Sequence, residues 1–424
     1  MNIAFTKRKR GELYELTSKI IDEYLDNSGD NPVTPRIDQS EIRERTRNYN
    51  FEEPIEFKHA IQILTKLLRD GNLHSSNPRY MGLFVPKVLF PGVIADTLTA
   101  AFNPNLGSWG HAPFPVEVET YLIEEFGRKF GYSLPNIDGV FTSGGAEANL
   151  NAVLCALQAK YSDYWKIGLK GRDPVIYCST ESHHSLLKAA RIAGIGSDSV
   201  IRIESSTQLT INVRLLQEQI EKDIANKKEP LMIVGTAGTT GAGAFDDLTE
   251  LSRISKRYEF WFHVDAAYGG ALILNDELKG PLKGIELSDS ITFDLHKWPA
   301  APVGTSIFLT SNNEVLHKLF RISADYMPNE NRKVVDPYAH SVNWSRRPIG
   351  LKVYLTLLMI GWQGYSDLIK HHFETGNLLR QLLEDRGWVV MNETVLPLIC
   401  FIHPKLIGEN ERVQIVCDKL VESG

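Results

Sequence analysis

The sequence predicts an α/β protein, in which a mostly parallel β-sheet lies between helices. A helical N-terminal arm and a small C-terminal α+β domain are expected beside it. Short β-rich runs alternate with helical patterns through the middle of the chain, as parallel strands joined by helices require. The 424 residues also exceed what one hydrophobic core usually holds, so a second domain is expected.

The N-terminal part, 1–90, is expected to form the arm. Apolar residues recur at helical spacing from Gly11 to about Asn27, and a second helical pattern stops at Gly71. An extended, proline-bounded segment with aromatic side chains follows. This segment would dock on a partner subunit or line a cleft.

The large domain is expected over 91–345. Its probable strands are 139–143, 175–179, 231–236, 260–265, 290–294 and 306–310. The polar groups of interest follow these strands directly, where open α/β sheets bind their ligands. The smaller domain, 346–424, opens with a long helical pattern and continues with a strand-like run. It ends on a helix without a closing strand, which would fit a truncated domain.

The composition excludes several classes of protein. With 43% hydrophobic and 23% charged residues and a net charge of −6, the chain has no basic stripe for nucleic acid. No apolar run approaches the roughly 20 residues that cross a bilayer, and charges interrupt the N-terminus where a signal peptide would be apolar. We therefore expect a cytoplasmic protein with no membrane contact, and its four cysteines are expected to be reduced.

The run "TSGGAEANL" predicts a phosphate site. It follows a strand and opens a helix, so Ser143, Gly144, Gly145 and Ala146 would surround free N–H groups at the helix start. A plain loop is the alternative, because paired glycines are common.

Two further strand ends carry a carboxylate and an amine. Asp265 in "HVDAAYGG" would otherwise be an ordinary helix cap. Lys297 in "DLHKWP" would otherwise cap a carbonyl or extend to solvent. A phosphate cradle, a carboxylate and a lysine at one sheet edge match the needs of pyridoxal phosphate, with Lys297 as the Schiff-base lysine. At an effective dielectric constant of about 20, Asp265 would hold the ring nitrogen protonated with roughly 4 kcal/mol.

Other polar residues near these strand ends extend the candidate site. His183 would stack on the cofactor ring, or be a hydrogen-bonded core imidazole. Thr240 would touch the ring or its substituents, and Asp246 would orient a neighbour. No metal site is expected, because His183 and His184 do not share a helix face and no carboxylate spacing accompanies them.

These motifs resemble those of the group II pyridoxal-phosphate-dependent amino-acid decarboxylases, which include aromatic-amino-acid, histidine and glutamate decarboxylases. "HVDAAYGG" followed by "HKW", and their order with "TSGGAEANL", carry the resemblance. It implies a fold type I architecture with a seven-stranded sheet. It also implies a homodimer whose active site lies at the subunit interface.

The resemblance also assigns roles to residues. Lys297 matches the lysine that binds the cofactor, Asp265 the partner of the ring nitrogen, and His183 the stacking histidine. Phosphate and other cofactor contacts would come from Gly145, Ala146, Asp294 and His296, and Tyr326 in "SADYMP" would protonate the substrate Cα. Residues expected near the substrate are Tyr80, Leu83, Phe84, Asn105 and Trp109.

The resemblance leaves the substrate and the outcome open. Asn105 and Gly107 would make the pocket roomier and more polar than in the aromatic-amino-acid enzymes, so the sequence does not identify the amino acid. Decarboxylation of an L-amino acid is the leading hypothesis, since Tyr326 is present. An aldehyde-forming oxidative deaminase, a carbon–carbon lyase and a non-catalytic dimeric scaffold are the alternatives.

Overall fold

A computed structural model of the protein describes residues 5–35, 38–49, 51–82, 84–322 and 334–423. The chain divides into two compact units, Val88–Ile402 and a second unit made of Met1–Lys87 and His403–Gly424. The predicted division at residues 90 and 345 stays a prediction.

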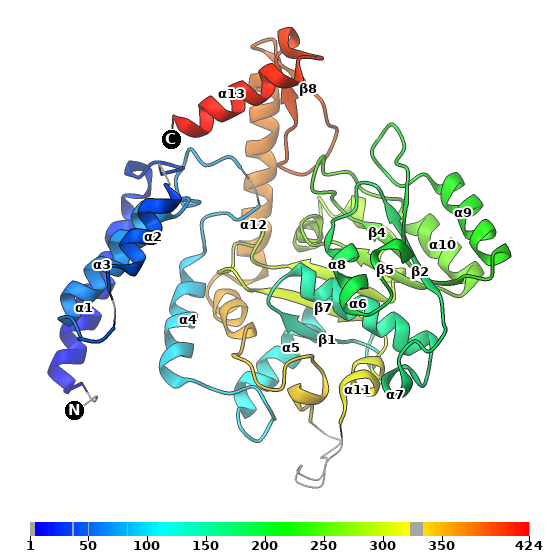
Figure 1. The fold of residues 1–424 in the computed structure, drawn as a ribbon, viewed down its shortest axis with the longest axis horizontal. Helices are drawn as coiled ribbons and strands as arrows, with labels where there is room; N and C mark the ends of the chain where they lie inside the picture. The colour runs from blue at the N-terminus through cyan, green and yellow to red at the C-terminus, as the bar shows by residue number, and fades with distance from the viewer. Residues whose placement is uncertain (1–4, 36–37, 50, 83, 323–333, 424) are drawn as a thin grey trace. The chain divides into compact units, whose positions relative to one another are not determined.

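The larger unit is built on a seven-stranded sheet in the order β1-β7-β6-β5-β4-β2-β3 (Figure 1). Its strands are β1 (Asp138–Thr142), β2 (Pro174–Ser179), β3 (Val200–Ile203), β4 (Glu229–Thr236), β5 (Trp261–Asp265), β6 (Ser290–Asp294) and β7 (Ser306–Thr310). The neighbours from β3 to β6 are parallel, whereas β7 is antiparallel to both β6 and β1. The predicted α/β fold with a mostly parallel sheet is confirmed.

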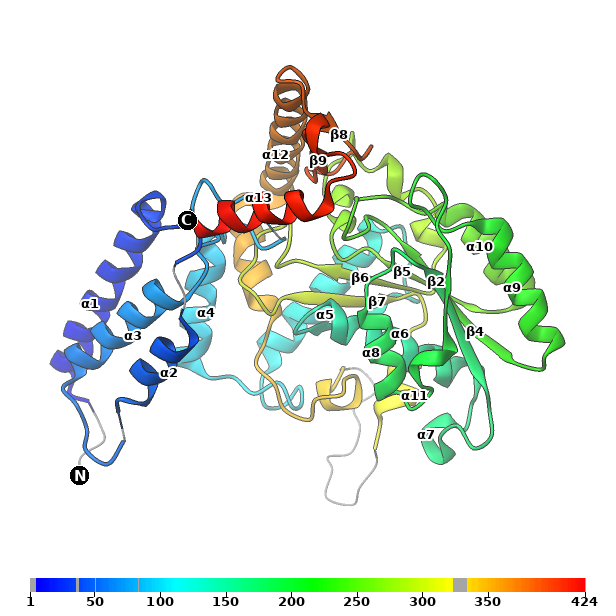
Figure 2. The same cartoon turned by 45° about the horizontal axis from the view of Figure 1, so that its top comes forward.

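Helices cover both faces of this sheet (Figure 2). The helices of this unit are α4 (Phe90–Phe102), α5 (Pro113–Lys129), α6 (Gly145–Lys160), α7 (Tyr164–Ile167), α8 (Ser185–Ile192), α9 (Val213–Ala225), α10 (Leu248–Tyr258), α11 (Val315–Phe320) and α12 (Gly350–Glu384). Apolar side chains of α5, α9, α10 and α12 form one buried cluster with the sheet. Side chains of α6, α8 and α11 form another.

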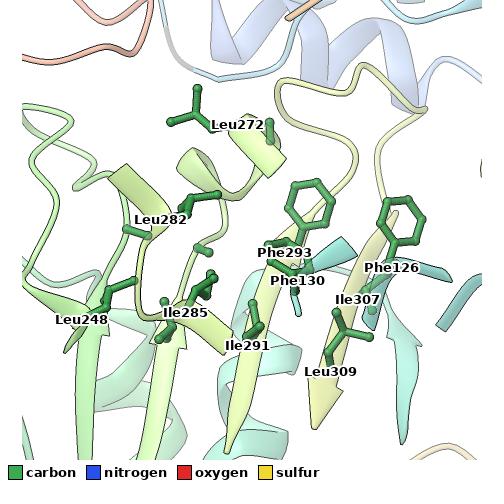
Figure 3. Close-up of a cluster of buried hydrophobic side chains, with 14 of the residues drawn as sticks. Phe126, Phe130, Leu248, Leu272, Leu282, Ile285, Ile291, Phe293, Ile307 and Leu309 are labelled. Atoms are coloured by element: carbon green, nitrogen blue, oxygen red, sulfur yellow. The ribbon is translucent and has the colours of Figure 1, made fainter. Parts of the chain in front are cut away.

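Strand β6 places apolar side chains on one face of the sheet and polar side chains on the other. Its side chains alternate between the two faces, as in any strand. Ile291 and Phe293 join the cluster that contains Phe126 and Phe130 (Figure 3). The intervening residues, Ser290, Thr292 and Asp294, are fully buried on the opposite face. That face packs against α6. Because the apolar residues of β6 occupy the other face, its polar side chains point toward α6.

The helix α12 bends at Gly361, whose φ of 64° interrupts the helical backbone. Left-handed backbone of this kind is cheapest for glycine. The strand-like run that the sequence places after this helix forms two short antiparallel strands, β8 (Val389–Val390) and β9 (Phe401–Ile402). The four cysteines are free in the structure.

The smaller unit contains α1 (Lys7–Asp26), α2 (Gln39–Arg47), α3 (Phe57–Gly71) and α13 (Asn410–Glu422). An ion pair of 2.7 Å between Arg45 Nη1 and Asp70 Oδ2 joins α2 to α3. The hydroxyl of Tyr24 lies 3.1 Å from His74 Nδ1. A membrane-spanning helix needs a length and apolarity that none of the helices in the described part of the chain combines.

Candidate active site

The glycines of "TSGGAEANL" lie where α6 begins. Gly144 is the N-cap residue and Gly145 the first helical residue, and no side chain in the described ranges caps this helix end. Ser143 instead donates its N–H and its hydroxyl to Glu147 Oε2, at 2.8 and 2.6 Å. The first N–H groups of α6 have no partner within the helix, so the positive end of the helix dipole can attract an anion.

Only glycine fits at position 145, because the backbone there lies close to Asp294. A Cβ atom at this position would come within 2.9 Å of Asp294 Oδ2, a contact that real Cβ atoms essentially never make. A Cβ atom on Gly144 would lie 3.9 Å from His296 Cε1. The two glycines thus bring the helix start against the side chains that follow β6.

Lys297 is held by the same carboxylate. Its Nζ lies 3.1 Å from Asp294 Oδ2, and its side chain is 23% exposed whereas that of Asp294 is 3% exposed. The hydroxyl of Ser306 on β7 also donates to Asp294. The amine is therefore positioned by a buried carboxylate and still reachable from outside, as a covalent attachment point must be.

Asp265 ends the adjacent strand β5. Its side chain is buried; Oδ1 accepts a hydrogen bond from the N–H of Ala267 at 3.2 Å, and Oδ2 accepts one from Asn149 Nδ2 at 2.9 Å. Asp265 pairs in register with Thr236 of β4 and Thr292 of β6. A charged side chain that is buried in this way is stable only with such partners.

His183 lies just before α8, and its ring is exposed. Its Nδ1 is 2.8 Å from Ser185 Oγ. Thr240 is also exposed, in the loop that follows β4. These two side chains are accessible to a ligand.

Asp246 is buried and binds only backbone. Its oxygens accept hydrogen bonds from the N–H groups of Thr236 and Ile211, at 2.8 and 2.7 Å. Burial raises the pKa of Asp246 to about 6, although these two hydrogen bonds act in the opposite direction. Asp246 therefore supports the end of β4.

The residues predicted near the substrate are spread over both units. Tyr80 and Phe84 belong to the smaller unit, and burial raises the pKa of Tyr80. Asn105 and Trp109 belong to the larger unit, where Trp109 Nε1 donates to Glu117 at 2.7 Å. Leu83 and Tyr326 lie outside the described residues, so all these substrate and proton-donor assignments stay predictions.

The sequence reasoning missed the buried polar side chains that surround Asp265 and Asp294. They are Asn149, Ser185, His263, Thr292 and Ser306. Some of them could have been found from the sequence, because every second residue of a strand points to the same face of the sheet. His263 shares a strand face with Asp265, and Thr292 shares one with Asp294, so polar residues at these positions had to face the same helix.

The residues present fit pyridoxal phosphate. An uncapped helix start offers N–H donors for a phosphate, a partly exposed lysine offers a primary amine, and a buried carboxylate offers a partner for a ring nitrogen. These three groups lie at the carboxyl ends of β1, β6 and β5. The donor set therefore matches the anionic, carbonyl and basic groups of this cofactor.

A separate cleft of about 530 Å³ lies along β1, α5 and α11. Its lining includes Glu119, Asp138, His317 and His340, and none of the described residues that line it is a sequence-predicted site residue. The candidate active site is therefore distinct from this cleft.

Comparisons with known proteins agree with this site. A family model described as "Pyridoxal-dependent decarboxylase conserved domain" matches residues 43–403. The aromatic-L-amino-acid decarboxylase of Bacillus atrophaeus is 27% identical over 414 residues, which cover 96% of this chain and 85% of the relative. The L-2,4-diaminobutyrate decarboxylase of Acinetobacter baumannii is 30% identical over 331 residues, covering 74% of this chain and 64% of the relative.

Solved structures share the fold. The structure of Oryza sativa TDC with PLP and tryptamine superposes with a TM-score of 0.88 at 21% identity, and covers 95% of this chain and 84% of that one. The Rhodiola rosea 4-hydroxyphenylacetaldehyde synthase superposes with a TM-score of 0.87 at 19% identity, and covers 99% and 90%. Since the family model spans most of the sequence and the fold agrees, this chain belongs to the pyridoxal-dependent decarboxylases, a family of pyridoxal-phosphate-dependent amino-acid decarboxylases.

Proposed function

We propose that this protein decarboxylates an L-amino acid to the corresponding amine and carbon dioxide. The observation that carries this proposal is the placement of a lysine amine and a buried carboxylate beside an uncapped helix start, at one edge of the sheet. Because the chain belongs to this family, its substrate is expected to be an amino acid. The identity of that amino acid stays open.

When bound, pyridoxal phosphate supplies an aldehyde for an amine and a protonated ring that accepts electrons from a bond at the substrate Cα. Lys297 Nζ would hold the cofactor covalently, and the N–H groups at the start of α6 would bind its phosphate. The carboxylate of Asp265 would keep a proton on the ring nitrogen, because a negative charge at contact distance favours the protonated form. His183 would lie against the ring, and the hydroxyl of Tyr326 would return a proton to the Cα.

A second candidate function is decarboxylation with oxidative deamination, in which molecular oxygen accepts two electrons and the products are an aldehyde, ammonia, carbon dioxide and hydrogen peroxide. The superposition on the Rhodiola rosea 4-hydroxyphenylacetaldehyde synthase supports it. The presence of Tyr326 favours simple decarboxylation.

Product analysis tests the proposal. The protein, reconstituted with pyridoxal phosphate, is incubated with each common L-amino acid, and carbon dioxide, amine, aldehyde and ammonia are quantified. Amine equimolar with carbon dioxide is expected for at least one amino acid, with none from Lys297→Ala. Aldehyde and ammonia in place of amine would select the second candidate. A cofactor-loaded protein that releases no carbon dioxide from any amino acid would contradict both.

We also propose that the protein is a cytoplasmic homodimer with its active site at the subunit interface. Light scattering of the purified protein tests the assembly. A mass near twice the 47.7 kDa of the chain is expected, and a monomer that retains full activity would contradict the interface site.

A further inference from the structure

Asn149 occupies the centre of a buried hydrogen-bond network beneath the candidate site. It lies on the second turn of α6 and is 1% exposed. Its Nδ2 donates to Asp265 Oδ2 at 2.9 Å and to Ser185 Oγ at 2.8 Å. Its Oδ1 accepts from Thr292 Oγ1 at 2.7 Å and lies 3.0 Å from His263 Nε2. All the hydrogen-bonding capacity of this amide is therefore used, and its partners come from two strands, β5 and β6, and from the helix α8.

The hydrogen-bond directions on one side of Asn149 follow from Asp265, whose carboxylate accepts from Asn149 Nδ2 and so leaves Oδ1 facing His263. The indole Nε1 of Trp261 can only donate, and it does so to Ser290 Oγ at 2.8 Å. The Ser290 hydroxyl keeps its own hydrogen, which it can donate to His263 Nδ1 at 2.8 Å. Burial lowers the pKa of His263 to about 4, so its ring is neutral at pH 7. Because Asn149 Oδ1 can only accept, the His263 nitrogen that faces it, Nε2, carries the hydrogen.

The other side of Asn149 leads to His183. Since Asn149 Nδ2 donates to Ser185 Oγ, the Ser185 hydroxyl has its own hydrogen left for His183 Nδ1. The backbone N–H of Ser185 points to the same Nδ1 at 3.2 Å. A backbone N–H can only donate, so His183 Nδ1 accepts and carries no hydrogen, and the Ser185 hydroxyl then donates to it as well. The neutral ring of His183 must therefore carry its hydrogen on Nε2.

We propose that Asn149 is a positioning residue that couples Asp265 to His183. Through one amide nitrogen it donates to the carboxylate of Asp265 and to Ser185 Oγ, and it thereby holds the hydroxyl that donates to the exposed imidazole of His183. The proposal rests on the proposed function only in giving Asp265 and His183 their roles toward the cofactor. The network itself consists of buried side chains of this chain.

The tautomer of His183 is the first test, and it needs neither cofactor nor substrate. Nitrogen NMR of the protein with 15N-labelled histidine distinguishes a protonated from an unprotonated ring nitrogen, and the His183 signals are assigned by comparison with His183→Asn. We expect an unprotonated Nδ1 in the native protein. Ser185→Ala removes the hydroxyl, keeps the backbone N–H and should fold, so we expect Nδ1 to stay unprotonated and its 15N signal to shift because one of its two hydrogen bonds is lost. A protonated Nδ1 in the native protein, or an Nδ1 signal that does not move in Ser185→Ala, would overturn the proposal.

The affinity for pyridoxal phosphate is the second test, because Asp265 is the other end of the coupling. Removing a hydrogen bond to a charged group weakens binding by about tenfold or more. Asn149→Leu, of similar size, should raise the Kd for pyridoxal phosphate by that factor and should also shift the His183 Nδ1 signal, because the Ser185 hydroxyl loses the donor that holds it. Ser185→Ala should change the Kd by less than about threefold, since Asp265 keeps its partner.

Asn275→Leu is the matched control. Asn275 is equally buried, at 4% exposure, and donates to Ser366 of α12 instead of to the site. This variant should lose thermal stability and leave both the Kd and the His183 Nδ1 signal unchanged. Equal effects of Asn149→Leu and Asn275→Leu on the Kd would reduce Asn149 to a structural residue and overturn the proposal. If the native protein binds the cofactor but releases no carbon dioxide, the proposed function fails while the tautomer result stands.

Discussion

At the scale of single residues, the carboxylate of Asp265 has two hydrogen-bond donors and almost no contact with water. Two donors on different oxygens hold the carboxylate in one orientation. A neutral amide in its place would retain the shape and lose the charge. This difference isolates the electrostatic role that we assign to Asp265.

Asp265→Asn should therefore lower kcat by about a thousandfold. This value follows from roughly 4 kcal/mol for a charge pair at contact distance and from a tenfold change in rate for each 1.4 kcal/mol. Steady-state assays of carbon dioxide release measure it. Asp276→Asn, which changes an exposed carboxylate, is the control and should leave kcat unchanged. A loss smaller than tenfold in Asp265→Asn would contradict the assigned role.

Gly145→Ala tests the tight approach of α6 to Asp294. The added Cβ would meet Asp294 Oδ2 at 2.9 Å, so the helix start or the buried carboxylate must move. We expect the Kd for pyridoxal phosphate to rise more than tenfold, because misplaced donors lose a charge-assisted hydrogen bond. Fluorescence titration with the cofactor measures this. Gly280→Ala, where no atom lies within 4 Å of the added Cβ, should bind normally, and normal binding by Gly145→Ala would refute the spatial argument.

At the scale of elements, the start of α12 depends on a side chain from α5. Glu119 Oε1 accepts hydrogen bonds from the N–H groups of Ile349 and Gly350, at 2.7 and 3.0 Å. Its Oε2 lies 2.6 Å from Arg346 Nη2, and both side chains of this ion pair are buried. One carboxylate thus caps a helix and compensates a buried guanidinium.

Glu119→Gln should lower the free energy of unfolding by about 3 to 5 kcal/mol, because it leaves a buried cation without its partner. Chemical denaturation measures this change. Glu314→Gln removes the carboxylate of an exposed pair with Lys318 and should have no measurable effect, as is usual for surface pairs. Equal stabilities of the two variants would show that the cap is unimportant.

Asp246 makes the connection between β4 and its following loop sensitive to pH. Because the pKa of Asp246 is about 6 in the folded protein and about 3.9 in an unfolded chain, the folded state holds the proton more tightly. Its contribution to stability is therefore fully present below about pH 4 and is lost as the pH rises through about 6. His263, whose folded pKa is about 4, acts in the opposite direction over a similar range.

A comparison of variants separates the two groups. The stability of the native protein relative to Asp246→Asn should fall by about 2 kcal/mol between pH 4 and pH 6.5. Urea denaturation at several pH values measures the difference. A difference that does not change with pH would contradict the raised pKa of Asp246.

At the scale of the whole molecule, the sequence predicted the sheet better than the site. The six predicted strands form, with ends within two residues of the prediction, because buried parallel strands are continuous apolar runs. The strand β3 was missed, since four residues that include Arg202 do not stand out from a loop.

Only those residues of the candidate site could be predicted whose position relative to a strand end is visible in the sequence. Lys297 and Asp265 stand at strand ends, and a strand end is visible in one sequence. Asn149 is 116 positions from Asp265 and lies among alanines and leucines of α6. Which buried amide meets which carboxylate depends on the packing of α6 on the sheet, and no pattern along the chain records it.

The central claim is that Lys297 is the lysine that binds pyridoxal phosphate covalently. The most direct measurement is borohydride reduction of the cofactor-loaded protein, followed by mass spectrometry of its peptides. We predict one pyridoxyl group per chain, located on Lys297, and no visible absorption band after reduction. A pyridoxyl group on another lysine, or a bound cofactor that borohydride does not attach, would contradict the account.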